Sequence, residues 1–224
     1  MVDEILVMEH VTKTFGHGHT AMTAINDATL TVSRGRFVSI VGPSGSGKST
    51  LLTIAGGLQR PSSGQVQVNG IELTGLSNAQ VTATRFHQIG FVLQRSNLIP
   101  YLTVYQQLAL VDRVARRGER KQKIHDLLDS LDILALVDKY PKDLSGGERQ
   151  RAAMARALYG EPSLILADEP TASLDTDHAY DVVRLLAEQT KKYRKATVMV
   201  THDMRMTEAS DVVYRMKDGK LSRQ

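Results

Sequence analysis

The chain has 224 residues, of which 42% are hydrophobic and 23% are charged, a composition typical of a globular protein and too apolar for a disordered one. Its formal net charge of +4 does not indicate a dedicated nucleic-acid or lipid surface, and the absence of cysteine excludes disulfides, thiolate zinc sites and thiol catalysis. The sequence has no membrane-length apolar run and no secretory signal, so we expect a soluble, cytoplasmic protein without a nucleic-acid partner.

Strand patterns and helical patterns alternate along the chain. Short apolar segments bounded by turn residues predict strands at 5–8, 28–32, 37–41, 89–93, 164–167, 197–200 and 212–214. Residues 64–73 have the pattern of a hairpin around Asn69-Gly70. From Val104 to Leu136 the apolar residues recur with a period near 3.6, which predicts a mostly helical insertion. The alternation predicts an α/β fold with a largely parallel sheet.

A phosphate-binding pattern follows the predicted strand at 37–41. The segment Gly42-Pro43-Ser44-Gly45-Ser46-Gly47-Lys48-Ser49 fits G-x-x-x-x-G-K-[ST], and a helical pattern begins at Thr50. Glycines let backbone N–H groups point inward as an anion nest, and the helix N-terminus attracts the same phosphates. We expect Lys48 to reach the β- and γ-phosphates and Ser49 to ligate Mg²⁺. The strand and helix on either side favour this interpretation over a chance match in a Gly/Ser-rich turn.

Two acidic residues follow the buried-strand pattern at 164–167. Asp168 and Glu169 come at its carboxyl end, where open α/β sheets bind ligands. Asp168 suits a Mg²⁺ ligand, and Glu169 suits a base that orients water near the γ-phosphate. The alternative is a pair of solvated carboxylates in a loop, and the phosphate-binding pattern favours the catalytic interpretation.

A third pattern, Leu144-Ser-Gly-Gly-Glu-Arg-Gln150, opens a predicted helix. Ser145 as N-cap with Glu148 three residues later forms a capping box, and this alone requires no further function. Gly146 and Gly147 nevertheless weaken the first helical turn, and close approach of the backbone to an anion would explain them. We therefore predict a second phosphate cradle here.

In order and spacing, these patterns resemble the ATP-binding subunits of ABC transporters along essentially the whole chain. Residues 42–49 match the Walker A motif, 144–150 the signature motif, and 164–169 the Walker B motif with its catalytic Glu. Further matches are Phe15 at the adenine-stacking position, Gln94 in the Q-loop, Ser173-Leu174-Asp175 as the D-loop and His202 as the switch histidine.

The resemblance implies an ATPase that uses ATP and Mg²⁺. It implies a P-loop NTPase (RecA-like) core at about 1–94 and 157–224, an antiparallel β subdomain, and an inserted helical subdomain at about 95–156, all in one domain over 1–224. The implied catalytic residues are Glu169, His202, Lys48 and Gln94, and the implied Mg²⁺ ligands are Ser49, Gln94 and Asp168. ATP would contact Phe15, residues 42–50, Ser145, Gly146, Gly147 and Glu148.

The resemblance also implies partners. Two copies of the chain would pair head to tail around two ATP molecules, and two copies of a separate membrane permease would dock near Leu98–Leu102, at the cytoplasmic face of the membrane. Leu98-Ile99-Pro100-Tyr101-Leu102 is an apolar run in a predicted loop, which favours such docking over packing inside the helical insertion.

Within the family the sequence is most similar to the branch of lipoprotein-releasing, macrolide-efflux, haem-efflux and peptide-resistance ATPases. This branch implies export or membrane extraction of an amphipathic or hydrophobic substrate. The alternative is a cell-division-type ATPase that signals through a membrane partner without moving solute. His17 and His19 are interpreted as surface-loop residues rather than metal ligands.

Overall fold

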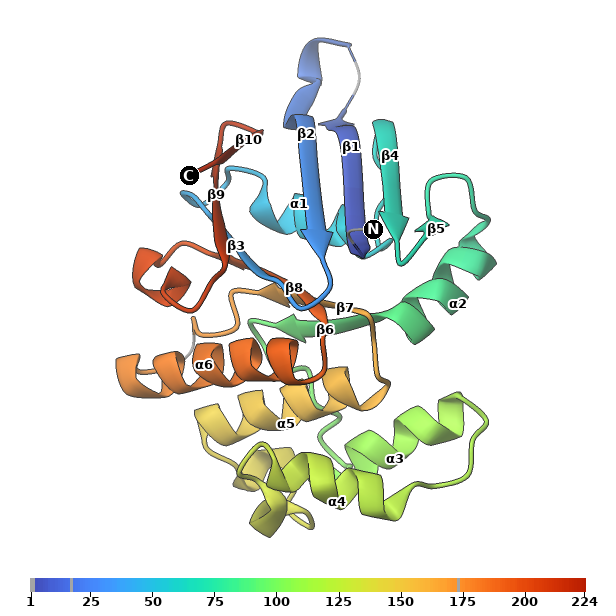
Figure 1. The fold of residues 1–224 in the computed structure, drawn as a ribbon, viewed down its shortest axis with the longest axis vertical. Helices are drawn as coiled ribbons and strands as arrows, with labels where there is room; N and C mark the ends of the chain where they lie inside the picture. The colour runs from blue at the N-terminus through green and yellow to red at the C-terminus, as the bar shows by residue number, and fades with distance from the viewer. Residues whose placement is uncertain (1–2, 17, 173) are drawn as a thin grey trace.

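The computed structural model describes residues 3–16, 18–172 and 174–224 and consists of two sheets with helices packed between and beside them (Figure 1). His17 and Ser173, which the sequence analysis singled out, lie outside the described residues. The described helices include none that is long and apolar enough to cross a membrane.

The larger sheet has six strands in the order β10-β9-β3-β8-β7-β6. Their bounds are β3 (Phe37–Val41), β6 (Ile89–Leu93), β7 (Leu164–Asp168), β8 (Ala196–Thr201), β9 (Val212–Lys217) and β10 (Lys220–Arg223). All neighbouring pairs are parallel except β9 with β10. Helices cover both faces, so β3 is buried at all five positions and is apolar except for Ser39, whose hydroxyl hydrogen-bonds that of Ser210 at 2.6 Å. The predicted parallel α/β sheet is confirmed.

The smaller sheet is antiparallel, in the order β2-β1-β4-β5. It comprises β1 (Glu4–Phe15), β2 (Met22–Ser33), β4 (Ser63–Val68) and β5 (Ile71–Glu72). The predicted hairpin is confirmed, and Asn69 and Gly70 both have positive φ, as a tight hairpin turn requires. β1 and β2 extend beyond the predicted segments. Bulges, with His10 and Asp27 at positive φ, interrupt the alternation of apolar and polar residues, so the sequence pattern did not reveal the full length of either strand.

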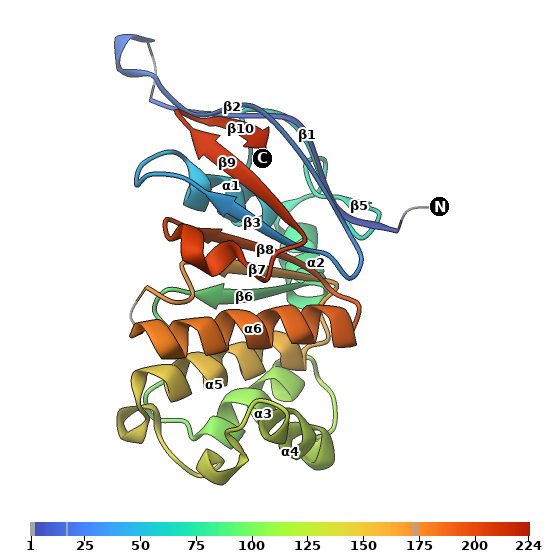
Figure 2. The same cartoon turned by 60° about the vertical axis from the view of Figure 1, so that its left-hand side comes forward.

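Helices fill three positions around the sheets (Figure 2). α1 (Lys48–Ala55) lies between the two sheets and packs against both. α5 (Gly146–Tyr159) and α6 (Thr176–Lys192) cover the other face of the large sheet. α3 (Val104–Val114), α4 (Lys121–Asp129) and a 3₁₀ turn (Leu134–Leu136) lie beyond α5, which confirms a mostly helical segment from 104 to 136.

α2 (Asn78–Gln88), just before β6, was not predicted. It has a capping box between Ser77 and Gln80, but only Val81 of its eleven residues is buried, so its sequence carries little apolar periodicity. Short 3₁₀ turns at Gly18–Thr20, Pro141–Asp143 and Met204–Thr207 complete the elements.

Candidate functional site

The loop between β3 and α1 requires glycine at two close contacts. A Cβ on Gly42 would lie 2.1 Å from the carbonyl oxygen of Met216, and one on Gly47 would lie 2.3 Å from that of Ala24. Gly47 also has φ +104°, a conformation that L side chains rarely adopt. The loop is therefore held against β9 and β2 in one tight conformation.

The loop and the start of α1 bring an ammonium group and backbone N–H groups close together. Lys48 is only 6% exposed, and its Nζ donates hydrogen bonds to the carbonyl oxygens of Gly42 (2.8 Å) and Pro43 (3.0 Å). α1 begins at Lys48, and its N-cap Gly47 offers no side-chain acceptor to the first N–H groups of the helix. Uncapped N–H groups, the helix dipole and an ammonium group together form an anion-binding arrangement.

An oxygen-donor pair joins α1 to the end of β7. The Ser49 hydroxyl donates to Asp168 Oδ1 at 3.0 Å. Burial raises the pKa of Asp168 above its ordinary value; the Ser49 hydrogen bond opposes this rise, and the charge of Glu169 adds to it. Hard oxygen donors of this kind are the ligands that Mg²⁺ prefers, so the pair fits this cation.

Glu169 and His202 meet at the carboxyl ends of the adjacent strands β7 and β8. Glu169 Oε2 lies 2.9 Å from His202 Nδ1, and the Glu169 side chain is the more buried of the two. Glu169 has φ +46°, and its backbone N–H donates to the Val200 carbonyl oxygen at 3.0 Å. A non-glycine residue held in this conformation is uncommon, and such strain concentrates at functional sites.

One open cleft of about 520 Å³ brings most of the predicted residues together. Those that line it are Phe15, Ser44, Gly45, Gly47, Lys48, Ser49, Thr50, Gln94, Glu169 and His202. The volume is within the range of small-molecule pockets. Gly42, Pro43 and Ser46 belong to the same loop without lining the cleft, and Asp168 reaches it through Ser49.

Met22, Ala24 and Ala172 also line the cleft, although the sequence did not predict them there. Met22 is the β2 residue opposite Phe15 and is 62% exposed, so these two side chains form an apolar rim at the mouth of the cleft. The sequence carried no signal for Met22, because its pairing with Phe15 and its exposure are seen only in the structure.

The start of α5 is not part of this cleft. Ser145, Gly146, Gly147 and Glu148 are all described, and none of them lines it. The predicted capping box is confirmed: Glu148 Oε2 accepts from the Ser145 N–H at 2.6 Å, and Ser145 Oγ accepts from the Glu148 N–H at 3.3 Å. The second predicted cradle therefore faces elsewhere on the surface.

Side chains from α3 and α5 hold the loop that leaves the cleft at Gln94. Buried Gln150 donates to the Leu93 carbonyl oxygen at 3.1 Å, and buried Gln107 exchanges hydrogen bonds with the Ile99 backbone at 2.7 and 3.1 Å. Within the apolar run, Leu98 packs partly against the helical core, whereas Tyr101 is 75% exposed. The sequence did not predict an anchoring role for either glutamine, although Gln150 ends the predicted signature motif; a polar residue at an apolar helical position was the signal.

Comparisons with known proteins agree with this arrangement. The family model described as ABC transporter matches residues 25–172. The hemin import ATP-binding protein HrtA of Staphylococcus haemolyticus is 44% identical over 218 residues, covering 96% of this chain and 98% of that protein. HrtA of Staphylococcus aureus (strain Newman) is 41% identical, with 97% and 99% covered.

Solved structures give the same result. The dimeric ATP-binding cassette MJ0796, bound to ADP and Pi in a post-hydrolysis state, superposes with a TM-score of 0.88 at 36% identity over 98% of both chains. The cassette cbiO1 of Clostridium perfringens has a TM-score of 0.88 at 28% identity, covering 98% of this chain and 87% of that one. The predicted ABC ATPase fold is confirmed, and this chain belongs to the ABC transporter family as one of its ATPase cassettes.

Proposed function

We propose that two copies of this chain pair head to tail, hydrolyse ATP between them and drive a separate membrane permease. One observation carries this proposal. The cleft gathers Lys48, the Ser49–Asp168 pair and the Glu169–His202 pair, whereas the glycine-rich start of α5 lies outside it. A second anion cradle that cannot serve its own cleft can serve that of a twofold-related copy.

Within one chain, the cleft binds and orients ATP. The nest of residues 42–47, the start of α1 and Lys48 hold the phosphates, and Phe15 stacks on the adenine. Lys13 Nζ lies 5.3 Å from the Phe15 ring centroid, which keeps positive charge beside that platform. Ser49, Gln94 and Asp168 would hold Mg²⁺, which supplies charge neutralisation on the phosphate oxygens.

Glu169 is the general base for the attacking water. Its Oε atoms accept the water proton, and the His202 ring, 2.9 Å away, orients the carboxylate and faces the γ-phosphate. Ser145 and the Gly146 and Gly147 N–H groups of the other copy bind the same phosphate, so the pair closes with ATP and opens after hydrolysis.

Tyr101 and the loop around it are the proposed docking surface for the permease. An exposed tyrosine on a loop anchored by Gln107 presents an apolar contact on a defined backbone, as recognition of a partner helix requires. We assign residues 95–156 to the helical subdomain that carries this surface, at the cytoplasmic face of the membrane.

The proposed cargo is haem and the proposed direction is export. The proposed cargo is taken from the names of the HrtA relatives, which describe hemin import ATP-binding proteins. Those names indicate import, whereas the resemblance to the efflux branch supports export. Everted vesicles with the chain and its permease should accumulate haem when ATP is added, relative to vesicles carrying Lys48→Ala. ATP-driven loss of haem from everted vesicles would instead establish import.

Glu169→Gln tests the catalytic proposal. This variant should bind ATP, accumulate as a dimer on size-exclusion chromatography with ATP, and hydrolyse at least about tenfold more slowly, because the amide cannot accept the proton. Glu72→Gln, on the edge strand β5, is the matched control and should behave as wild type. Undiminished turnover by Glu169→Gln would refute the base assignment, and a monomer at every ATP concentration would refute the head-to-tail pair.

A further inference from the structure

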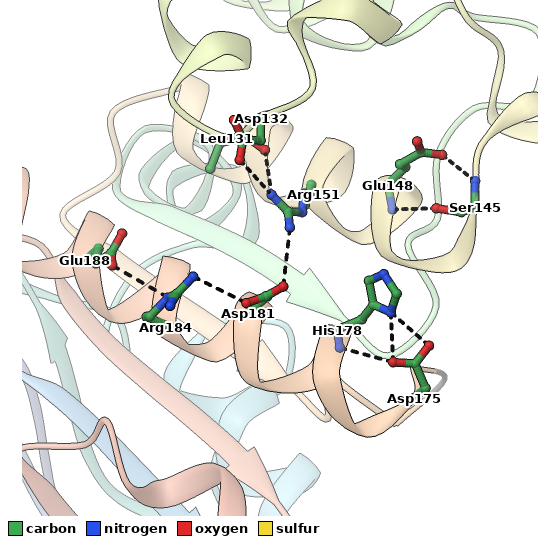
Figure 3. A network of polar contacts seen from close by, with 10 residues as sticks. All are labelled: Leu131, Asp132, Ser145, Glu148, Arg151, Asp175, His178, Asp181, Arg184 and Glu188. Carbon is green, nitrogen blue, oxygen red and sulfur yellow. Dashed lines mark hydrogen bonds and ion pairs between the residues drawn. The ribbon is translucent and has the colours of Figure 1, made fainter.

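His178, in the first turn of α6, lies beside the start of α5 and contacts Asp175, as Figure 3 shows. Asp175 is the N-cap of α6, and its Oδ1 accepts the backbone N–H of His178 at 3.1 Å. The His178 ring turns back to the same carboxylate, with Nδ1 2.8 Å from both Oδ1 and Oδ2. The ring therefore makes a contact beyond the helix cap.

The same ring faces the start of α5. A Cβ built on Gly147 would lie 3.3 Å from His178 Cδ2, so the glycine leaves room for the imidazole. Gly147 is buried, two residues after the Ser145 N-cap. His178 thus lies between a carboxylate at the start of one helix and the glycine-rich start of the other.

One turn further along, a charged contact holds the two helices in the same register. Arg151 of α5 lies 3.9 Å from Asp181 of α6 and 3.7 Å from Asp132, and it donates to the Leu131 carbonyl oxygen at 3.3 Å. Asp181 also pairs with Arg184 (Figure 3). The two helices are therefore also in contact one turn beyond His178.

We infer that His178 is a positioning residue that sets the first turn of α5 against Asp175. This inference rests on the proposed function, in which that turn binds the γ-phosphate of the other copy. The imidazole fixes the distance between Gly147 and the α6 N-cap, and so the direction of the Gly146 and Gly147 N–H groups. His178 does not line the cleft of its own chain.

A purely structural role as part of the α6 cap predicts different behaviour. Asp175 caps α6 through the backbone N–H of residue 178, which any side chain at that position retains. Loss of the ring therefore leaves the cap in place, whereas it removes the link to Gly147.

Three variants separate these roles. His178→Ala removes the link; His178→Gln retains an amide donor toward Asp175; His178→Glu has nearly the same size as Gln but places a second carboxylate there. Glu188→Gln, on the exposed face of the same helix, is the matched control. For each full-length variant, kcat, the KM for ATP, the ATP affinity of the monomer and the melting temperature are measured. Dimerisation is measured in the Glu169→Gln background.

We expect His178→Ala to lower kcat at least about fivefold, because small misplacements of binding groups cost large factors in rate. Its dimer should dissociate more readily, whereas the ATP affinity of its monomer should stay within about twofold of wild type, since the cleft is unchanged. His178→Gln should retain most of the wild-type kcat, and His178→Glu should be at least as impaired as His178→Ala.

Wild-type kcat and dimerisation in both His178→Ala and His178→Glu would overturn the inference. Equal kcat values for His178→Gln and His178→Glu would also overturn it, and this comparison decides the question even if His178→Ala does not fold. Failure of the proposed function is distinguishable, because it would appear as absent ATP hydrolysis in the wild type or absent dimer in Glu169→Gln alone.

Discussion

Asp112 of α3 is the carboxylate whose removal should most weaken the helical segment. It is 1% exposed and accepts hydrogen bonds from the Arg120 backbone N–H (3.1 Å), Nε (3.0 Å) and Nη2 (2.7 Å), and from the Tyr159 hydroxyl. The Arg120 guanidinium also lies over the Tyr159 ring, 4.8 Å from its centroid. One side chain therefore joins α3, the start of α4 and the end of α5.

Asp112→Ala should cost about 3 kcal/mol of unfolding free energy. Removing one partner of a buried ion pair costs about 3–5 kcal/mol. The low end applies because Arg120 remains partly exposed and lies 3.9 Å from Glu161, so its charge is not left fully buried. At about 2–4 °C per kcal/mol for a chain of this size, the melting temperature should fall by about 6–12 °C.

Urea unfolding followed by circular dichroism measures this loss directly. Glu188→Ala is the control: its carboxylate is 61% exposed and lies 3.9 Å from the 73% exposed Arg184, and exposed pairs of this kind contribute about 1 kcal/mol or less. A destabilisation below about 1 kcal/mol for Asp112→Ala would refute the reasoning, since it would mean that the buried network adds no more than a surface pair.

The stabilisation that Asp112 contributes to the folded state should decrease at acidic pH. Burial alone would raise the pKa of Asp112, but hydrogen bonds from Arg120 and Tyr159 outweigh burial and hold it below its ordinary value. The stabilisation is therefore fully present above the unfolded-state pKa of about 3.9 and is lost as the pH falls through the lower folded-state value. The difference in stability between wild type and Asp112→Ala should be constant from pH 7 to about pH 5 and shrink below about pH 4. A difference that stays constant down to pH 2.5 would contradict this.

Two further predictions concern the cleft and the proposed docking loop. Gly47→Ala should weaken ATP binding at least about tenfold in equilibrium titrations, because its Cβ would lie 2.3 Å from the Ala24 carbonyl oxygen at an unfavourable φ; unchanged affinity would contradict the fixed loop conformation. Tyr101→Asp should abolish co-purification of the permease while leaving ATP binding and the melting temperature unchanged, because this side chain is 75% exposed; a retained complex would place the docking surface elsewhere.

Helices and strands with a clear apolar pattern in the sequence could be predicted. Those that depend on packing against distant segments of the chain could not. β3 and β6 have the predicted bounds, because their apolar runs are buried between helices. α2 has a single buried residue and gave no periodic signal. The full lengths of β1 and β2 were hidden because positive φ at His10 and Asp27 shifts the alternation along each strand. Burial and backbone strain of this kind arise only when distant segments pack.

The sequence by itself determined the chemistry of each site segment. A glycine-rich turn between a strand and a helix is local in the chain, as are the acids after β7 and the capping box before α5, so each could be interpreted where it stands. The tertiary structure decided which of these segments meet. Ser49 and Asp168 are 119 residues apart in the chain. They hydrogen-bond because β3, which precedes Ser49, and β7, which ends at Asp168, lie in the same parallel sheet with β8 between them, and long-range packing sets this strand order. The same packing keeps the start of α5 out of the cleft and brings His178 to Gly147, which no spacing along the chain encodes.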